Sequence, residues 1–133
     1  MELNRPVVDV NVDAGIATIT MVDSASANAL GERMVHELVA AFEYVSGCAD
    51  VRVVVLEGEG AHFSSGAPID LLLRLVRGEL EPSDITLPRA LLGCAVPVVA
   101  AVAGHAVGGG FALALAADIV VILKWPSTVA LRP

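Results

Sequence analysis

Three consecutive glycines, Gly108, Gly109 and Gly110, separate a short apolar run from an Ala/Leu-rich run, Phe111 to Ala117. Glycine has no side chain, so a ligand can approach the backbone of such a turn closely and the N–H groups can point outward. The second run has good helix propensity, and the unpaired N–H groups and the dipole at a helix N-terminus both favour negative charge. The pattern therefore predicts a place to hold an oxyanion.

A second stretch of small residues, Gly58 to Asp70, follows an apolar run, Val51 to Leu56, that is typical of a buried parallel strand. Val98 to Val102, just before the glycines, is another β-branched run of the same kind. Loops that follow such strands face the ligand crevice of open α/β sheets. The Gly58 to Asp70 loop is therefore expected to face a ligand.

The rest of the chain must position these two loops. Val7 to Val12 and Ile16 to Met21 alternate apolar and polar residues around Asp13-Ala14-Gly15, which predicts a β-hairpin. From Glu32 to Ser46 the apolar residues recur at helical spacing, with Glu32, Glu37 and Glu43 turned outward, and Gly47 ends the helix. With the strand at 51–56 the order is β-β-α-β, so the class is α/β. Further helices are expected at 71–76 and, capped by Ser83-Asp84, through Leu92.

Composition sets limits on partners. The 133 residues suit one domain, but 56% of them are hydrophobic and the mean hydropathy is +0.74, so an exposed apolar surface is expected. A net charge of −7 with no basic patch excludes nucleic acid. Cys48 and Cys94 form neither a CxxC motif nor a zinc-ligand pattern, so no metal is expected. The N-terminus has no apolar signal region, which favours the cytoplasm.

Three motifs in order resemble the enoyl-CoA hydratase/isomerase, or crotonase, superfamily: ASANAL (25–30), FSSGA (63–67) and AGHAVGGG (103–110). The resemblance covers about Ile16 to Leu123. It implies a crotonase-like fold of repeated ββα units and a site for acyl thioesters of coenzyme A or an acyl carrier protein, without a further cofactor. In that family two backbone N–H groups hold the thioester oxygen, and the matching residues are Ala67 and Gly109.

The chemistry explains why these positions are small. A thioester that becomes an enolate places charge on its oxygen, and preorganised N–H donors stabilise that charge. Gly109→Val is therefore expected to fill this space and abolish binding. The resemblance also implies substrate contacts at seven neighbouring positions, namely Ala25, Ala27, Gly66, Pro68, Ile69, Asp70 and Gly108. Alternatively, the glycines serve only close packing of helix and strand.

A finer resemblance is to the polyketide-associated decarboxylating members, which act on carrier-bound enoyl substrates during β-branching. Ser26 stands where many members place a basic residue near coenzyme A, which favours a carrier protein. The decarboxylases carry a lysine just after the Gly-Ala pair, where this chain has Ile69 and Asp70. The hydratases carry a glutamate after the glycines, where this chain has Ala112. If active, the protein would be a lyase or an isomerase, and whether it is an enzyme stays open.

Acid–base chemistry needs a titrating group near the transferred proton. The nearby candidates are Asp70, His62, His105 and Asp118. Each also has a structural interpretation: Asp70 suits the first turn of a helix, Asp118 suits a hydrogen bond to backbone, His105 suits a structural role and His62 a loop surface.

Crotonase-like proteins are about twice as long as this chain. We therefore expect residues 1–123 to form the N-terminal part of a crotonase-like domain, with 124–133 as an irregular tail. We expect a partial site, and as partner either further copies of this chain in a trimer-based homo-oligomer or a full-length homologue. Two alternatives remain: a noncatalytic thioester-binding or scaffold subunit, and a membrane protein in which Val98 to Leu123 spans the bilayer. The charge of Asp118 argues against the second.

Overall fold

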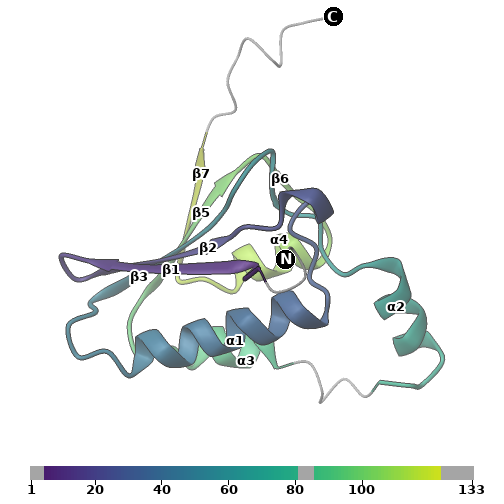
Figure 1. Cartoon of the computed structure of the whole chain (residues 1–133), viewed down its shortest axis with the longest axis horizontal. Coiled ribbons are helices and arrows are strands. Elements are labelled where there is room, and N and C mark those ends of the chain that lie inside the picture. Colours follow the sequence, from purple (N-terminus) through teal and green to yellow (C-terminus); the bar gives the residue numbers. More distant parts are fainter. Residues whose placement is uncertain (1–4, 81–85, 124–133) are drawn as a thin grey trace, which may run out of the picture.

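The computed structural model describes residues 5–80 and 86–123, which form a twisted sheet with helices packed mainly on one face (Figure 1). The five strands lie in the order β1-β2-β3-β5-β7, and all neighbours are parallel except the antiparallel pair β1 and β2. The strands are β1 (Val8–Asp13), β2 (Ile16–Met21), β3 (Val53–Gly58), β5 (Val98–Ala103) and β7 (Ile119–Leu123). The predicted hairpin and the central position of β3 are confirmed.

The hairpin turn has a simple backbone explanation. Asp13 pairs with Ile16, so the loop contains only Ala14 and Gly15, with φ of 51° and 82°. Positive φ at both positions is the type I′ geometry that suits the right-handed twist of two adjacent strands. Ala14 tolerates this conformation at some cost, whereas Gly15 adopts it freely.

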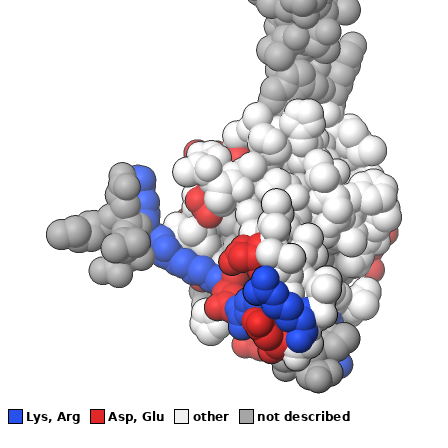
Figure 2. All heavy atoms as spheres, turned by 90° about the vertical axis from the view of Figure 1, so that its right-hand side faces the viewer, with Lys and Arg blue, Asp and Glu red and all other residues white. Residues whose placement is uncertain are grey.

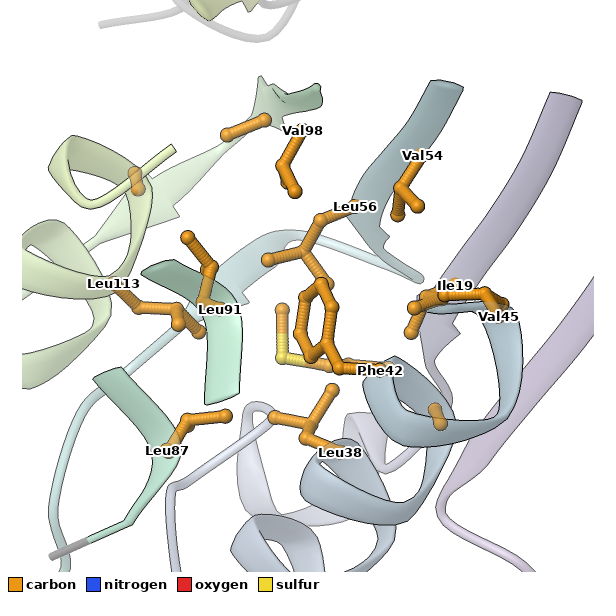
Figure 3. Packing of buried hydrophobic residues seen from close by; sticks show 14 of the residues in the cluster. Ile19, Leu38, Phe42, Val45, Val54, Leu56, Leu87, Leu91, Val98 and Leu113 are labelled. Atoms are coloured by element: carbon orange, nitrogen blue, oxygen red, sulfur yellow. The ribbon is translucent and has the colours of Figure 1, made fainter. Parts of the chain in front are cut away.

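The helix α1 (Glu32–Ser46) packs its apolar side on the sheet. Met34, Leu38, Phe42 and Val45 are buried, as their spacing predicts, and Gly47 caps the helix. Phe42 and Leu38 lie among side chains of the strands and of α3 (Leu87–Leu92) in the main core (Figure 3). The predicted start of α3 at Ser83-Asp84 lies outside the described residues.

The outward orientation predicted for Glu37 is wrong. Its carboxylate is partly buried, and Oε1 accepts hydrogen bonds from the backbone N–H groups of Val7 (2.9 Å) and Val8 (3.2 Å). Oε2 is 2.9 Å from Nε of Arg33, one helical turn before it. Glu37 therefore fastens the beginning of β1 to α1, a contact between distant parts of the chain that helical spacing cannot indicate.

A small second sheet joins the two predicted ligand loops. The strands β4 (His62–Ser64) and β6 (His105–Ala106) run parallel, with His62 opposite His105. Both stretches were expected as loop. The short ladder is too brief to show a periodic pattern in sequence, but it fixes the two loops to each other.

Two elements leave apolar side chains exposed. The helix α2 (Ile69–Val76) has no buried residue and projects from the body of the molecule (Figure 1). The edge strand β7 is exposed along its whole length, and Ile122 is 79% exposed. The apolar surface expected from composition is thus present on these elements.

The region considered as a membrane span is not one helix. Residues 98–123 form β5, β6, α4 (Gly109–Leu115) and β7 in turn. None of the helices in 5–80 and 86–123 is long and apolar enough to cross a bilayer. The predicted irregular tail, 124–133, lies outside the described residues.

Candidate active site

The three glycines at the beginning of α4 differ in what constrains them. Gly108 has φ 55° and ψ −119°, and the N–H of Gly110 donates to the carbonyl of Val107 at 2.9 Å, which is a type II′ turn. A Cβ at Gly110 would lie 2.3 Å from the carbonyl oxygen of Ser64, so the helix packs on backbone there. Gly109 has neither constraint: a Cβ there would meet only ordinary contacts, at 3.5 Å or more.

The Gly58 to Asp70 loop reaches the same place. Gly66 has φ 87°, and its carbonyl accepts the N–H of Leu30 at 2.9 Å. A Cβ on Gly66 would lie 2.6 Å from the carbonyl oxygen of Val107 and 3.0 Å from the nitrogen of Gly109. The backbones of the two loops are therefore in direct contact, and glycine at position 66 permits that contact.

Two buried polar residues that the sequence did not single out hold the first loop. The amide of Asn28 accepts from the N–H of Asp23 at 2.9 Å and donates to the carbonyls of Glu59 (3.2 Å) and His62 (2.9 Å). The hydroxyl of Ser64 donates to the carbonyl of Asn28 at 2.8 Å and accepts from the N–H of Gly66 at 3.2 Å. Both side chains are fully buried. Only their polarity within small-residue motifs could have indicated this role.

The two predicted donors lie side by side. A Cβ placed on Gly109 would be 3.5 Å from the backbone nitrogen of Ala67. Neither of the two N–H groups donates a hydrogen bond to any residue of the described chain. Both residues line one cavity of about 710 Å³, which we call the acyl cavity. Two uncommitted N–H donors at one cavity wall are the arrangement that an oxyanion requires.

The acyl cavity lies among α1, α2, α3 and α4, and its described lining is mainly apolar. Leu87 and Leu113 connect it to the core, where both lie on the same side of the cluster and point into it (Figure 3). Three leucines of α2 form another wall. The described lining consists of Leu30, Gly31, Glu32, Val35, His36, Ala67, Leu71, Leu72, Leu75, Leu80, Thr86, Leu87, Pro88, Gly109, Ala112, Leu113 and Ala116.

Glu32 and His36 are the ionisable side chains in this described lining. Glu32 is hydrogen-bonded to Arg74, and this bond raises the pKa of Arg74 above its ordinary value. Oε2 of Glu79 lies 3.9 Å from Nε of Arg74. Figure 2 shows this end of the molecule, where acidic and basic side chains are grouped beside a broad uncharged surface. The pair Arg74–Glu32 thus links α2 to α1 at the cavity.

None of the four predicted acid–base candidates belongs to the described lining. Asp118 accepts the N–H of Val98 at 2.7 Å, so its structural interpretation is confirmed. His62 does not sit on a loop surface as expected: it is partly buried in β4, with its ring centroid 5.1 Å from that of His105. Asp70 is exposed in the first turn of α2.

A second cavity, of about 570 Å³, lies beside the first, and Gly31 and Glu32 line both. Ala25 and Pro68, two of the predicted substrate contacts, line this second cavity together with Arg5 and Arg33. The remaining predicted contacts lie outside the two described linings. They are Ala27, Gly66 and Gly108, which have positive φ, and Ile69 and Asp70, which are exposed at the start of α2.

Ala27 has a structural role that the geometry makes plain. Its φ is 56°, and it ends a short 3-10 helix (Ser24–Ser26) by donating to the carbonyl of Ser24. Its own carbonyl accepts the N–H of Ser65 at 3.0 Å. The backbone of Ala27 therefore joins the ASANAL segment to the loop that carries Ala67.

Known proteins match this α/β sheet, in which two adjacent N–H groups without a described acceptor lie at an apolar cavity. The sequence profile of the Enoyl-CoA hydratase/isomerase family matches residues 11–130. Bacillaene synthase decarboxylase PksI of Bacillus subtilis is 34% identical over 115 residues, which are 86% of this chain and 46% of PksI.

Solved structures agree with the sequence match. A structure from a dehydratase/decarboxylase enzyme couple involved in polyketide beta-branching superposes with a TM-score of 0.82 at 35% identity, over 86% of this chain and 47% of that one. The ECH2 decarboxylase domain of CurF from Lyngbya majuscula gives a TM-score of 0.78 at 38% identity, over 87% and 47%.

The chain therefore belongs to the enoyl-CoA hydratase/isomerase family, and the predicted crotonase-like fold class is confirmed. Within the family it is similar to enzymes of polyketide β-branching. It spans about half the length of the relatives that it matches.

Proposed function

We propose that the protein binds acyl thioesters in the acyl cavity and stabilises the thioester enolate with the N–H groups of Ala67 and Gly109. The observation that carries this proposal is that both N–H groups lack an acceptor within the described chain while lining the same cavity. The similarity to PksI and to the CurF decarboxylase domain supports a carrier-bound enoyl substrate of polyketide β-branching.

The mechanism follows from the charge that develops. When a saturated α-carbon loses a proton, or when the γ-carbon of an enoyl thioester loses a carboxyl group as carbon dioxide, the electron pair left behind moves toward the carbonyl, in the second case through the C=C bond, and negative charge grows on the carbonyl oxygen. Two fixed donors in an apolar cavity stabilise that oxygen without the reorganisation that water would need. The N–H of Gly109 also stands at the beginning of α4, where the unpaired amides favour negative charge.

The second cavity can hold the pantetheine arm of a thioester whose acyl group lies in the acyl cavity. It adjoins the acyl cavity at Gly31 and Glu32, and Pro68 lies in its wall directly after Ala67. Arg5 and Arg33 in its lining suit the phosphate of a pantetheine arm. Coenzyme A and a carrier protein share this arm, and binding assays with each would distinguish them.

Noncatalytic thioester binding is the second candidate function. It is favoured by the placement of Asp70, His62, His105 and Asp118 outside the described lining of the acyl cavity. The lining also contains Ala112, at the position where the resemblance places a glutamate in hydratases. A subunit of this kind would hold the thioester without turning it over.

Gly109→Ala tests the oxyanion proposal. The added methyl is compatible with the fold, because its closest contacts would be at 3.5 Å or more, but it lies beside the nitrogen of Ala67. The assays are calorimetric binding of hexanoyl pantetheine thioester against the thioether that lacks the carbonyl, and exchange of the α-hydrogens in D₂O. We expect wild type to prefer the thioester, and Gly109→Ala to lose that preference and about 100-fold of any exchange rate.

Gly47→Ala is the matched control, because Gly47 is a helix-capping glycine with φ −85° whose added Cβ would also meet its nearest atom at 3.5 Å. It should behave as wild type. Equal affinity of wild type for thioester and thioether would refute the proposal. A carbonyl-dependent preference without exchange would favour the noncatalytic candidate.

A further inference from the structure

Two histidines lie side by side on the short ladder that joins the two loops. His62 of β4 and His105 of β6 are direct partners in a parallel pair, and directly paired residues of neighbouring strands point to the same face of a sheet. The centroids of their rings are 5.1 Å apart, with an angle of 41° between the ring planes. Both residues lie outside the described linings of the two cavities, so the proposed thioester site does not use them.

The backbone holds both histidines in place. The carbonyl of His62 accepts a hydrogen bond from the buried amide of Asn28 at 2.9 Å. The N–H of His105 donates to the carbonyl of Ala61 at 3.1 Å. The end of β3 also packs closely against β4, because a Cβ on Gly58 would lie 2.8 Å from the carbonyl oxygen of His62. Two side chains on fixed backbones need little further ordering to bind one ligand, so the pair is preorganised.

The spacing of the two rings fits a shared metal ion. Zinc lies about 2.0–2.1 Å from a histidine nitrogen, and therefore about 3.2 Å from the centre of the ring. At the tetrahedral angle two such rings have centres about 5 Å apart, close to the observed 5.1 Å. The χ2 torsion of histidine is broad, so each ring can turn a nitrogen toward the ion within its χ1 rotamer.

The surroundings decide which ion suits the pair. Imidazole nitrogen is a preferred ligand of zinc, nickel and copper, whereas magnesium and calcium prefer oxygen. Within residues 5–80 and 86–123 no group of three or more histidine, cysteine or acidic residues could hold a metal, so these two rings are the protein ligands. His105 is exposed and His62 only partly buried, which lets water complete the coordination. The net charge of −7 also attracts cations to the surface.

We propose that His62 and His105 together bind one Zn²⁺ ion, or another divalent ion that prefers imidazole, and that this ion fastens β4 to β6. The next pair of the ladder, Ser64 and Ala106, leads into the loops that carry Ala67 and Gly109. A bound ion therefore stabilises the junction of these two loops. The inference does not depend on thioester binding. The expectation of no metal considered the cysteines, and two histidines far apart in the sequence form no local motif.

The test is a calorimetric titration of the protein with Zn²⁺ alone and, separately, with Mg²⁺. Wild type should bind one equivalent of Zn²⁺ and no Mg²⁺, because Mg²⁺ prefers oxygen ligands. His105→Phe keeps an aromatic ring opposite His62 but removes its nitrogens, and it should weaken Zn²⁺ binding about tenfold or more, as should His62→Phe. Zn²⁺ at about 100 times its Kd should raise the ratio of folded to unfolded wild type in urea about 100-fold. It should leave this ratio nearly unchanged in both variants.

His36→Phe is the matched control, because His36 is exposed on α1 rather than on the ladder. It should keep the wild-type affinity for Zn²⁺. Urea unfolding without metal shows whether each variant folds, and His105→Phe decides the matter if the partly buried His62 does not tolerate substitution. An affinity for Zn²⁺ in His105→Phe equal to that of wild type, as binding at Cys48 or Cys94 would give, would overturn the inference. Mg²⁺ binding as tight as that of Zn²⁺, or no Zn²⁺ binding by wild type, would also overturn it and leave the proposed function intact.

Discussion

The two loops that supply the N–H groups reach the acyl cavity by different physical means. The loop that carries Ala67 is held by side chains: the buried Asn28 and Ser64 make five hydrogen bonds to backbone around it. The turn that carries Gly109 has no such support from polar side chains among its own residues, Val107 to Gly110. It depends on a type II′ backbone at Gly108 and on close helix packing at Gly110.

The difference matters for how each loop can fail. Where side chains hold a loop, removing a polar group leaves its partners buried without hydrogen bonds. Where glycines make a turn possible, adding a single methyl group is the damaging change. The methyl either overlaps a neighbouring atom or places alanine at a φ that it adopts only at a cost. The two loops are therefore expected to respond to opposite kinds of substitution.

The largest expected effect comes from Gly110→Ala. The added Cβ would lie 2.3 Å from the carbonyl oxygen and 2.8 Å from the carbonyl carbon of Ser64, and backbone cannot move aside cheaply. Urea unfolding should show a loss of about 3 kcal/mol or more, at the upper end of overpacking costs. Gly47→Ala should change the free energy of unfolding by a few tenths of a kcal/mol, about the effect of an ordinary surface substitution. A Gly110→Ala protein as stable as wild type would mean that α4 does not pack on Ser64.

Asn28→Ala should have a comparable effect by the opposite route. It leaves the N–H of Asp23 and the carbonyls of Glu59 and His62 without their partner. It also places alanine at φ 53°, a conformation that asparagine tolerates better. We expect a loss of about 3 kcal/mol in urea unfolding, since each unsatisfied buried group costs about 1–3 kcal/mol. Asn11→Ala, at an exposed position of β1, is the control, and equal losses in both variants would contradict the role of Asn28.

These two positions also show what sequence could predict. The glycine triplet and the Gly66-Ala67 pair are visible as motifs because a turn beside a ligand demands the absence of side chains, and the two strands before them are visible as apolar runs. Asn28 was part of the ASANAL motif, but its partners are 31 and 34 residues away in the chain. Nothing local distinguishes a buried asparagine that joins three segments from an asparagine in an exposed turn.

Ser64→Ala should be milder than either. The variant loses the hydrogen bond to the carbonyl of Asn28 and the one from the N–H of Gly66. Removing the hydroxyl oxygen leaves only a small empty volume in the core. Two ordinary hydrogen bonds correspond to about 2 kcal/mol of unfolding free energy. Because Gly66 directly precedes Ala67, hexanoyl thioester affinity should fall as well. Ser65→Ala, whose partly exposed hydroxyl makes a long bond of 3.4 Å to Ser26, is the control and should leave both quantities nearly unchanged.

The acyl cavity itself was beyond prediction for a related reason. Its walls come from α1, α2, α3 and α4, so it exists only once the chain has folded. The sequence predicted a helix at 71–76 but gave no sign of what its leucines would contact. The structure places these leucines around the cavity and leaves none of the residues of α2 buried.

Gly108→Ala should lower the free energy of unfolding least. It shows how much of the cost of a methyl group in the glycine turn comes from backbone strain and how much from steric overlap. A Cβ at Gly108 would meet no atom of the described chain within 4 Å, so the cost comes only from φ 55° and ψ −119°. Such strain corresponds to about 1–2 kcal/mol in urea unfolding. Gly108→Asn should lose less, because asparagine adopts positive φ more readily than alanine. A loss in Gly108→Ala as large as that of Gly110→Ala would mean that steric overlap, rather than backbone conformation, governs the whole turn.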